Sequence, residues 1–318
     1  MSDGQPEKTA KIDRSCNSLE RQECWVRTPD GLRLWSERIG PADGRPLLLI
    51  MGAMNPGLVW PEGFCARLVA AGHAVIRYDA RDTGWSSSID FAVHPYTLDE
   101  MAADALAVLQ AHGVARAAVV GLSMGGYVAQ LLALAHPERL SALVLLSTSA
   151  DHRPYMAATL GGDLPDSPLP GPESMFIDHV RRTVSQPPQT PAALVAAQRE
   201  GWALTYGGSA GVPWQHIDTM LAAVAGRNRE PLAAFNHARA VAASPDRLAA
   251  VCHIALPTLV MHGLHDALLP IAHGRDLAQR IPGARLLELD MGHSFMGACD
   301  EAVLAAIIGF VAGQAAQQ

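Results

Sequence analysis

The stretch AAVVGLSMGGY, residues 117–127, joins an apolar run to a glycine-rich turn and then to the start of a second apolar run. Within it, GLSMG fits the pattern G-x-S-x-G, in which glycines on both sides of Ser123 leave room for a sharp turn. The second apolar run ends at His136-Pro137, as expected of a buried helix stopped by a proline. The sequence therefore predicts a strand, a tight turn that presents the Ser123 hydroxyl, and a helix.

Length and composition favour one large domain. With 318 residues, of which 49% are hydrophobic, the chain can bury a sizeable core and fits a single α/β domain with an insertion. The net charge of -7 and the lack of a basic cluster argue against nucleic acid or a membrane surface as partners. No apolar run approaches the roughly 20 residues that span a bilayer, and the first residues lack a signal-peptide pattern. We therefore expect a cytoplasmic protein directed at small molecules.

The cysteines indicate neither a metal site nor a disulfide framework. All five are scattered, and no two of them have C-x-x-C spacing: Cys16, Cys24, Cys65, Cys252 and Cys299. We expect them to be mostly buried packing residues, and we expect the protein to need no metal and no cofactor.

The order of predicted elements divides the chain into three parts. Residues 1–20 are polar and aperiodic, which predicts a flexible N-terminal leader. Strands and helices alternate over residues 21–148, after an opening antiparallel hairpin, and again over residues 246–318, which predicts an α/β core. Its mostly parallel sheet should have about eight strands flanked by helices. Residues 149–245 predict a helical cap inserted into this core, with helices near residues 175–184, 191–204 and 231–241.

Two later segments supply the partners that a reactive serine needs. A serine hydroxyl requires a base to remove its proton, and the base requires a carboxylate to hold its tautomer. The segment GLHDA, directly after one predicted strand, offers Asp266, and MGHS, after the next, offers His293. Because the carboxyl ends of parallel strands meet at one edge of the sheet, we expect Ser123, Asp266 and His293 as nucleophile, orienting acid and general base. Asp151, after an earlier strand, is the alternative acid.

Nearby histidines and acids are interpreted as structural. His262 lies within a strand end and is expected to be packed, and His265 is expected in a turn. Asp290 precedes His293 too closely along the chain to orient its ring.

A second loop has the composition of an oxyanion site. The apolar strand at residues 46–51 ends in GAMNPG, and acyl transfer requires amide donors for the oxyanion of its tetrahedral intermediate. The expected donors are the N–H groups of Met124, directly after the serine, and Ala53, with Met54 N–H as the alternative. The residues expected to bind substrate adjoin these elements: Met54, Trp60 and Phe295.

Together these segments resemble the α/β-hydrolase superfamily of the serine type over roughly residues 24–313. The order Ser, Asp, His along the chain is the order of that superfamily. Within it, the chain is similar to the aclacinomycin methylesterases, a family of anthracycline-tailoring enzymes, at residues 51–54, 60–64, 76–84, 94–96 and 121–125. The resemblance implies cofactor-independent cleavage of carboxylic esters through an acyl-enzyme, on small or medium apolar esters, methyl esters among them.

Other interpretations stay open. Lactonases, perhydrolases and carbon–carbon bond hydrolases use the same triad, and the fold does not choose among them. A non-catalytic ligand-binding protein of this fold is the alternative from a different class, although it has little need for a whole triad. Haloalkane dehalogenases and epoxide hydrolases carry aspartate at the elbow, so Ser123 argues against both. The expected partner is a small-molecule ester, and association with a second copy of the chain as a homodimer stays open.

Overall fold

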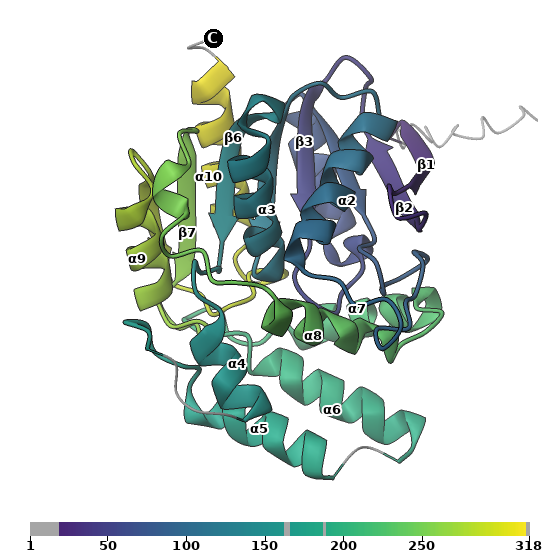
Figure 1. Cartoon of the computed structure of the whole chain (residues 1–318), viewed down its shortest axis with the longest axis vertical. Coiled ribbons are helices and arrows are strands. Elements are labelled where there is room, and N and C mark those ends of the chain that lie inside the picture. Colours follow the sequence, from purple (N-terminus) through teal and green to yellow (C-terminus); the bar gives the residue numbers. More distant parts are fainter. Residues whose placement is uncertain (1–18, 162–165, 187–188, 316–318) are drawn as a thin grey trace, which may run out of the picture.

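The computed structural model describes residues 19–161, 166–186 and 189–315 (Figure 1). The leader predicted for residues 1–20 lies outside this part of the chain, except for its last two residues. The described residues form a sheet with helices on both faces, and a group of further helices lies beyond one end of the sheet (Figure 1).

The eight strands of the described chain form one sheet in the order β1-β2-β4-β3-β5-β6-β7-β8. β1 pairs with β2 and β2 with β4 in antiparallel fashion, and the other neighbours are parallel. The mostly parallel eight-stranded sheet is therefore confirmed. The strands are β1 (Arg21–Arg27), β2 (Arg33–Ile39), β3 (Arg45–Ile50), β4 (His73–Tyr78), β5 (Ala117–Leu122), β6 (Leu140–Leu146), β7 (Thr258–Gly263) and β8 (Arg285–Leu289).

Both faces of the central strands are buried, which explains why their sequences are nearly continuous apolar runs. Along β3, Leu48 and Ile50 belong to one hydrophobic cluster, whereas Leu47 and Leu49 belong to the other. The first cluster is covered by α2 (Leu98–Ala111), α3 (Met124–Ala135) and α9 (Ala272–Arg280). The second is covered by α1 (Glu62–Ala70) and α10 (Asp300–Ala315). No helix among the described residues is long and apolar enough to cross a membrane.

Local sequence signals explain where several elements begin and end. Thr97 caps α2 through its hydroxyl and Glu100 reaches back to the Thr97 backbone, which forms a capping box. The turn at residues 28–32 closes the β1–β2 hairpin. Short 3-10 turns connect other elements: η1 (Gly57–Val59), η2 (Pro137–Arg139) and η4 (Val251–His253).

Between β6 and β7 the described chain is helical. Its helices are α4 (Arg153–Leu160), α5 (Ser174–Ser185), α6 (Pro191–Ala203), α7 (Trp214–Arg227) and α8 (Asn236–Ala243). They lie beyond the carboxyl ends of the strands, with α7 and α8 next to the sheet and α5 and α6 farther away (Figure 1). The boundaries of a separate cap domain stay a prediction.

Two of these helices, α4 and α7, are not among the three helices predicted individually from the sequence, although both lie in the stretch expected to be a helical insertion. The helix expected over residues 231–241 is wrong at its start, because the 3-10 turn η3 (Ala233–Phe235) precedes α8. Pro231 suits the first turn of a helix through its fixed φ, but the chain here forms a tighter turn that local propensity does not predict.

Candidate active site

Ser123 lies in the turn between β5 and α3, in a backbone conformation that few residues with a side chain adopt. Its φ is 55° and its ψ is -119°. A Cβ on Gly121 would meet the carbonyl of Gly125, and a Cβ on Gly125 would meet the carbonyl of Ile50 at the end of β3. Only glycine therefore fits on either side of Ser123, which is the physical basis of the G-x-S-x-G pattern.

Hydrogen bonds to β6 and the residues after it hold this turn on the sheet. Ser123 N donates to Leu146 O (2.9 Å), and Thr148 Oγ1 donates to Ser123 O (2.7 Å). The Ser123 residue is partly exposed, and its Oγ forms no hydrogen bond with any residue that the structure describes. The hydroxyl is thus held at the carboxyl edge of the sheet without a partner that would have to be displaced.

Asp266 and His293 are joined directly. His293 Nδ1 lies 2.8 Å from Asp266 Oδ2, and the two residues are 6% and 2% exposed. The other carboxylate oxygen accepts the N–H groups of Leu268 (2.9 Å) and Leu269 (2.8 Å). The loops after β7 and β8 therefore form one hydrogen-bonded unit at the carboxyl edge.

A second histidine supports the same carboxylate. His262 Nε2 lies 3.3 Å from Asp266 Oδ2 and donates to Leu269 O (2.7 Å). Burial acts to raise the pKa of Asp266, but the charges and hydrogen bonds of His293 and His262 outweigh burial and hold that pKa well below its usual range. His262 is buried, as expected, but its contact with Asp266 is not predicted from the sequence. The four-residue spacing at a strand end is the only signal for it.

The loop that contains His293 packs against aromatic residues that follow β3. β8 is the outermost strand, and β6 and β7 separate it from β5. The ring of Phe295 nevertheless packs against Trp60 (centroids 6.0 Å apart) and Phe64 (5.3 Å), which follow β3. The loop after β8 thus passes from its own strand to the β3 side of the sheet. His293, two residues before Phe295, lies on this path.

The residues expected to bind substrate differ in exposure. Trp60 and Phe295 are both 0% exposed, whereas Met54 is 37% exposed. Their roles in substrate binding stay predictions. Of the three, Met54 offers a surface to a ligand in this conformation, and the two aromatic residues position the loops.

The loop after β3 runs beside the serine. A Cβ on Gly52 would lie 3.3 Å from Ser123 Cβ and 4.0 Å from Ser123 Oγ. Two residues further on, Met54 N donates to His237 Nδ1 (2.9 Å), so this amide is already bound.

Two other amides near Ser123 are free. The N–H groups of Ala53 and Met124 form no hydrogen bond with the described part of the chain. Met124 is the first residue of α3, where an N–H has no intrahelical partner. Of the two loop amides considered from the sequence, Ala53 N–H is therefore the one available to a ligand.

The alternative acid and the turn histidine have other partners. Both carboxylate oxygens of Asp151 accept hydrogen bonds from the Arg153 side chain (2.8 and 2.7 Å). His265 Nε2 lies 2.9 Å from Asp290 Oδ1 at the surface. These contacts leave Asp266 as the carboxylate that holds His293.

The described cysteines and the other possible metal ligands form no metal site. Within the described ranges, no three His, Cys, Asp or Glu side chains are placed to hold a metal ion. The expectation of mostly buried cysteines is wrong for those the structure describes, because only Cys65 is buried, Cys24 and Cys299 are partly exposed and Cys252 is exposed. Their neighbours in the fold, which spacing does not reveal, set this exposure. Cys16 lies outside the described residues.

Comparison with known proteins gives consistent matches. The family described as alpha/beta hydrolase fold matches residues 45–297. Rhodomycin D methylesterase DnrP of Streptomyces peucetius is 42% identical over 289 residues, which cover 88% of this chain and 95% of that protein.

Solved structures agree with these sequence matches. A hydrolase from Pseudomonas aeruginosa PA01 superposes with a TM-score of 0.69 at 28% identity, covering 93% of this chain and 99% of that one. An esterase from Exiguobacterium antarcticum superposes with a TM-score of 0.73 at 20% identity, covering 92% of this chain and 100% of that one. At that identity the second match concerns the fold alone.

Proposed function

Because this chain belongs to the α/β-hydrolase family and is an ester hydrolase, we propose that Ser123, His293 and Asp266 form its catalytic triad. The hydrogen bond between His293 Nδ1 and Asp266 Oδ2 (2.8 Å) carries the proposal. It lies at the sheet edge where a strained turn presents the Ser123 hydroxyl. The glycines on either side of Ser123 allow this turn, because a Cβ on either of them would meet a backbone carbonyl.

The first half of the reaction follows from the protonation of these groups. An ionised Asp266 only accepts hydrogen bonds, so His293 Nδ1 carries the shared proton and His293 Nε2 is free to act as a base. Ser123 Oγ attacks the ester carbonyl carbon and passes its proton to His293 Nε2, while the carbonyl electron pair moves to the oxygen. The N–H groups of Ala53 and Met124 donate to this oxyanion.

Collapse of the tetrahedral intermediate breaks the bond between the acyl carbon and the alcohol oxygen. The protonated His293 gives its proton to the departing alcohol, and the acyl group stays on Ser123 Oγ as an ester. Water then attacks this ester and gives a proton to His293, which returns it to Ser123 Oγ. The products are a carboxylic acid and an alcohol.

We assign the substrates to methyl esters of apolar acids. Identity of 42% to a methylesterase supports a small alcohol group. The exposed Met54, beside the free Ala53 amide, supports an apolar acyl group, because a thioether side chain adapts to irregular apolar surfaces. Lactones and carbon–carbon substrates use the same triad but lack the small alcohol.

A hydrolysis panel that varies the acyl and alcohol groups separately tests the substrate assignment. For one fixed apolar acid, kcat/KM of the methyl ester should exceed that of the n-butyl ester about tenfold or more, since each methylene that a pocket must reject is worth about 1–3 kcal/mol. A lactone of matched size should react more slowly than the methyl ester. Equal rates across the alcohols would refute the methyl assignment and leave the triad untouched.

Ser123→Ala tests the triad itself. Its kcat should fall at least ~10⁴-fold, because the triad loses its nucleophile. A fluorophosphonate should label the wild-type protein stoichiometrically and leave the variant unlabelled. A folded variant that keeps a tenth of the wild-type turnover would rule out Ser123 as nucleophile.

A further inference from the structure

A histidine of the inserted helices contacts the loop after β3. His237, the second residue of α8, is 0% exposed, and its Nδ1 accepts a hydrogen bond from Met54 N–H (2.9 Å). Met54 has a φ of 68°, in the left-handed region that a side chain makes unfavourable. The backbone conformation of Met54 is therefore intrinsically unfavourable, and contacts from outside the loop are needed to maintain it.

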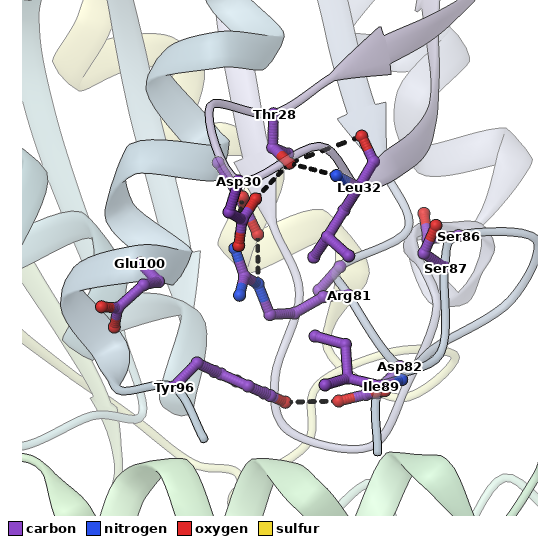
Figure 2. Close-up of polar contacts among 12 residues, drawn as sticks. Thr28, Asp30, Leu32, Arg81, Asp82, Ser86, Ser87, Ile89, Tyr96 and Glu100 are labelled. Atoms are coloured by element: carbon purple, nitrogen blue, oxygen red, sulfur yellow. Dashed lines mark hydrogen bonds and ion pairs between the residues drawn. The ribbon is translucent and has the colours of Figure 1, made fainter. Parts of the chain in front are cut away.

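The other ring nitrogen is anchored on the core. His237 Nε2 lies 2.7 Å from Arg81 O, in the loop after β4. The Arg81 guanidinium is fixed by two hydrogen bonds to Asp104 (2.7 and 2.8 Å). It also forms an ion pair with Asp30 at 3.2 Å, and the two residues lie side by side in Figure 2. The carbonyl that anchors His237 thus belongs to a segment that ion pairs hold in place.

The residue before His237 binds the same segment. Asn236 Nδ2 donates to Asp82 Oδ2 (3.2 Å) and to Ile89 O (2.9 Å). Asp82 Oδ2 also accepts the hydroxyl of Tyr96 (2.6 Å; Figure 2). Two consecutive residues therefore seat α8 on the loop after β4, and His237 extends this attachment to the loop after β3.

These partners define the protonation of His237. Arg81 O is only an acceptor, so Nε2 carries a proton, and Met54 N–H is only a donor, so Nδ1 carries none. Burial lowers the pKa of His237 and favours the same neutral ring, while the nearby charges of Asp82 and Arg81 act in opposite directions. A neutral imidazole in a single tautomer bridges the two backbone segments.

We propose that His237 is a positioning residue for ester hydrolysis. It binds Met54 N–H, and this fixes the turn so that the preceding Ala53 N–H stays free and directed at the oxyanion. This inference rests on the proposed function, because it assigns a role within the oxyanion site. His237 does not touch the reacting atoms. Since it comes from α8, it makes the donor geometry of a core loop depend on the seating of the inserted helices.

Two replacements separate the halves of the bridge. His237→Asn puts a carbonyl oxygen near the place of Nδ1 and keeps an acceptor for Met54 N–H. His237→Gln puts its amide near the place of Nε2 and keeps only the bond to Arg81 O. We expect the Asn variant to retain kcat within about threefold of wild type, and the Gln variant to lose about 10- to 100-fold in kcat with KM within about twofold.

The inhibition constant of a compound that forms an oxyanion in the site distinguishes a positioning role from a merely structural one, because a structural role would leave this constant unchanged. A trifluoromethyl ketone adds Ser123 Oγ to its carbonyl and so places an oxyanion in the site. Its inhibition constant should rise in the Gln variant by the same factor as kcat falls. The matched control is His179→Gln, a buried histidine of α5 that contacts Arg182, and it should leave kcat and inhibition unchanged.

A direct measurement on the wild-type protein keeps the test independent of whether the Gln variant folds. The N–H···N bond between Met54 and His237 should give a scalar coupling between the two nitrogens by NMR, with and without the inhibitor. On inhibitor binding, the Ala53 amide proton should shift downfield. Loss of the coupling in the complex, or a downfield shift of Met54 in place of Ala53, would overturn the proposal.

The outcomes also separate this inference from the proposed function. Equal losses in the folded Asn and Gln variants, or wild-type kcat and inhibition in the Gln variant, would remove the positioning role from His237. A wild-type protein that neither hydrolyses esters nor reacts with a fluorophosphonate would refute the proposed function.

Discussion

At the scale of single residues, the site is built from groups that the fold holds in unfavourable states. Ser123 and Met54 both have positive φ, at 55° and 68°, and such conformations cost about 1–3 kcal/mol each. Asp266 is 2% exposed, and its charge is stabilised by His293, His262 and two backbone N–H groups. The surrounding fold therefore prepares the site before any substrate binds.

Asp266→Asn tests the orienting role of the carboxylate. An amide can present its NH₂ group to His293 Nδ1, which would leave the proton on Nε2 and remove the base. We expect kcat to fall about 10⁴-fold while the fold is retained, as when a triad carboxylate is replaced by its amide. The measurement is single-turnover hydrolysis of a methyl ester, with circular dichroism as the check on folding.

Asp151→Asn is the matched control for that variant. Asp151 is a buried acid that follows β6, at the same end of the sheet, but its carboxylate binds Arg153. Its kcat should stay within about threefold of wild type, because the substitution leaves the tautomer of His293 unchanged. If the Asp151 variant lost more activity than the Asp266 variant, the assignment of the acid would have to be exchanged.

At the scale of elements, the site depends on the close approach of α3 to β3. A Cβ on Gly125 would meet the backbone of Ile50 and Met51, and a Cβ on Gly126 would meet the side chain of Thr148. The absence of a side chain at Gly125 therefore sets the distance between α3, which begins directly after Ser123, and the end of β3. Backbone atoms cannot yield as a flexible side chain can, so this distance is rigidly set.

Gly125→Ala should push α3 away from β3. The added methyl group overlaps a carbonyl, so we expect a loss of about 1–3 kcal/mol of unfolding free energy. We also expect kcat to fall about tenfold or more, because displacement of about 1 Å at a reacting centre costs that much or more. Urea unfolding and ester hydrolysis measure the two effects.

Gly309→Ala is the corresponding control in α10. Gly309 is also helical, but a Cβ there would meet nothing within 4 Å. Alanine should stabilise this helix by about 0.5–1 kcal/mol and leave kcat unchanged. Similar losses in the two variants would show that helix glycines in general, and not the contact with β3, limit the enzyme.

At the scale of the whole molecule, buried neutral histidines make stability depend on pH. Burial lowers the pKa of His152 to about 4 and that of His112 to about 4, against about 6.5 in an unfolded chain. Between these values the unfolded state binds more protons, so the contribution is complete above about pH 6.5 and is lost as the pH falls towards 4. Other buried histidines with lowered pKa, such as His73 and His273, act in the same direction.

His152 and His112 should therefore lower the free energy of unfolding between pH 7 and pH 5, whereas Asp104, whose pKa is raised by burial to about 6, acts in the opposite direction over the same range. The loss should reach up to about 2 kcal/mol from each of the two histidines. Urea unfolding at the two pH values measures it, and the lowered pKa of Asp266 acts only below this window. His152→Gln should reduce the difference between the two pH values, whatever its stability at pH 7. A wild-type free energy that is constant from pH 7 to 5 would contradict this account.

Much of the fold follows from local patterns. Continuous apolar runs predict β3 to β7 because those strands are buried on both faces, and the capping box at Thr97 predicts the start of α2. Between β6 and β7, the expected helices at residues 175–184 and 191–204 match α5 and α6, whereas α4 and α7 are not predicted individually. α4 buries only Pro154 and Met156, so it has no apolar periodicity to read, whereas α7 buries Ile217, Met220, Leu221 and Val224 at helical spacing and carries a pattern that predicts a helix.

Local sequence also identifies which residues have the chemistry for the site. The glycines around Ser123 predict its turn, and strand ends predict the positions of Asp266 and His293. Turn chemistry and hydrophobic period are encoded within a few neighbouring residues, so a single sequence suffices to find them.

Which residues of the site contact one another is decided only by the tertiary structure. Asp266 and not Asp151 binds His293, Trp60 and Phe295 are buried together, and His237 binds Met54 N–H. The two residues of each such contact lie between 27 and 235 positions apart in the chain. Such pairs depend on strand order and on the seating of α8, and no local pattern records which distant donor meets which acceptor.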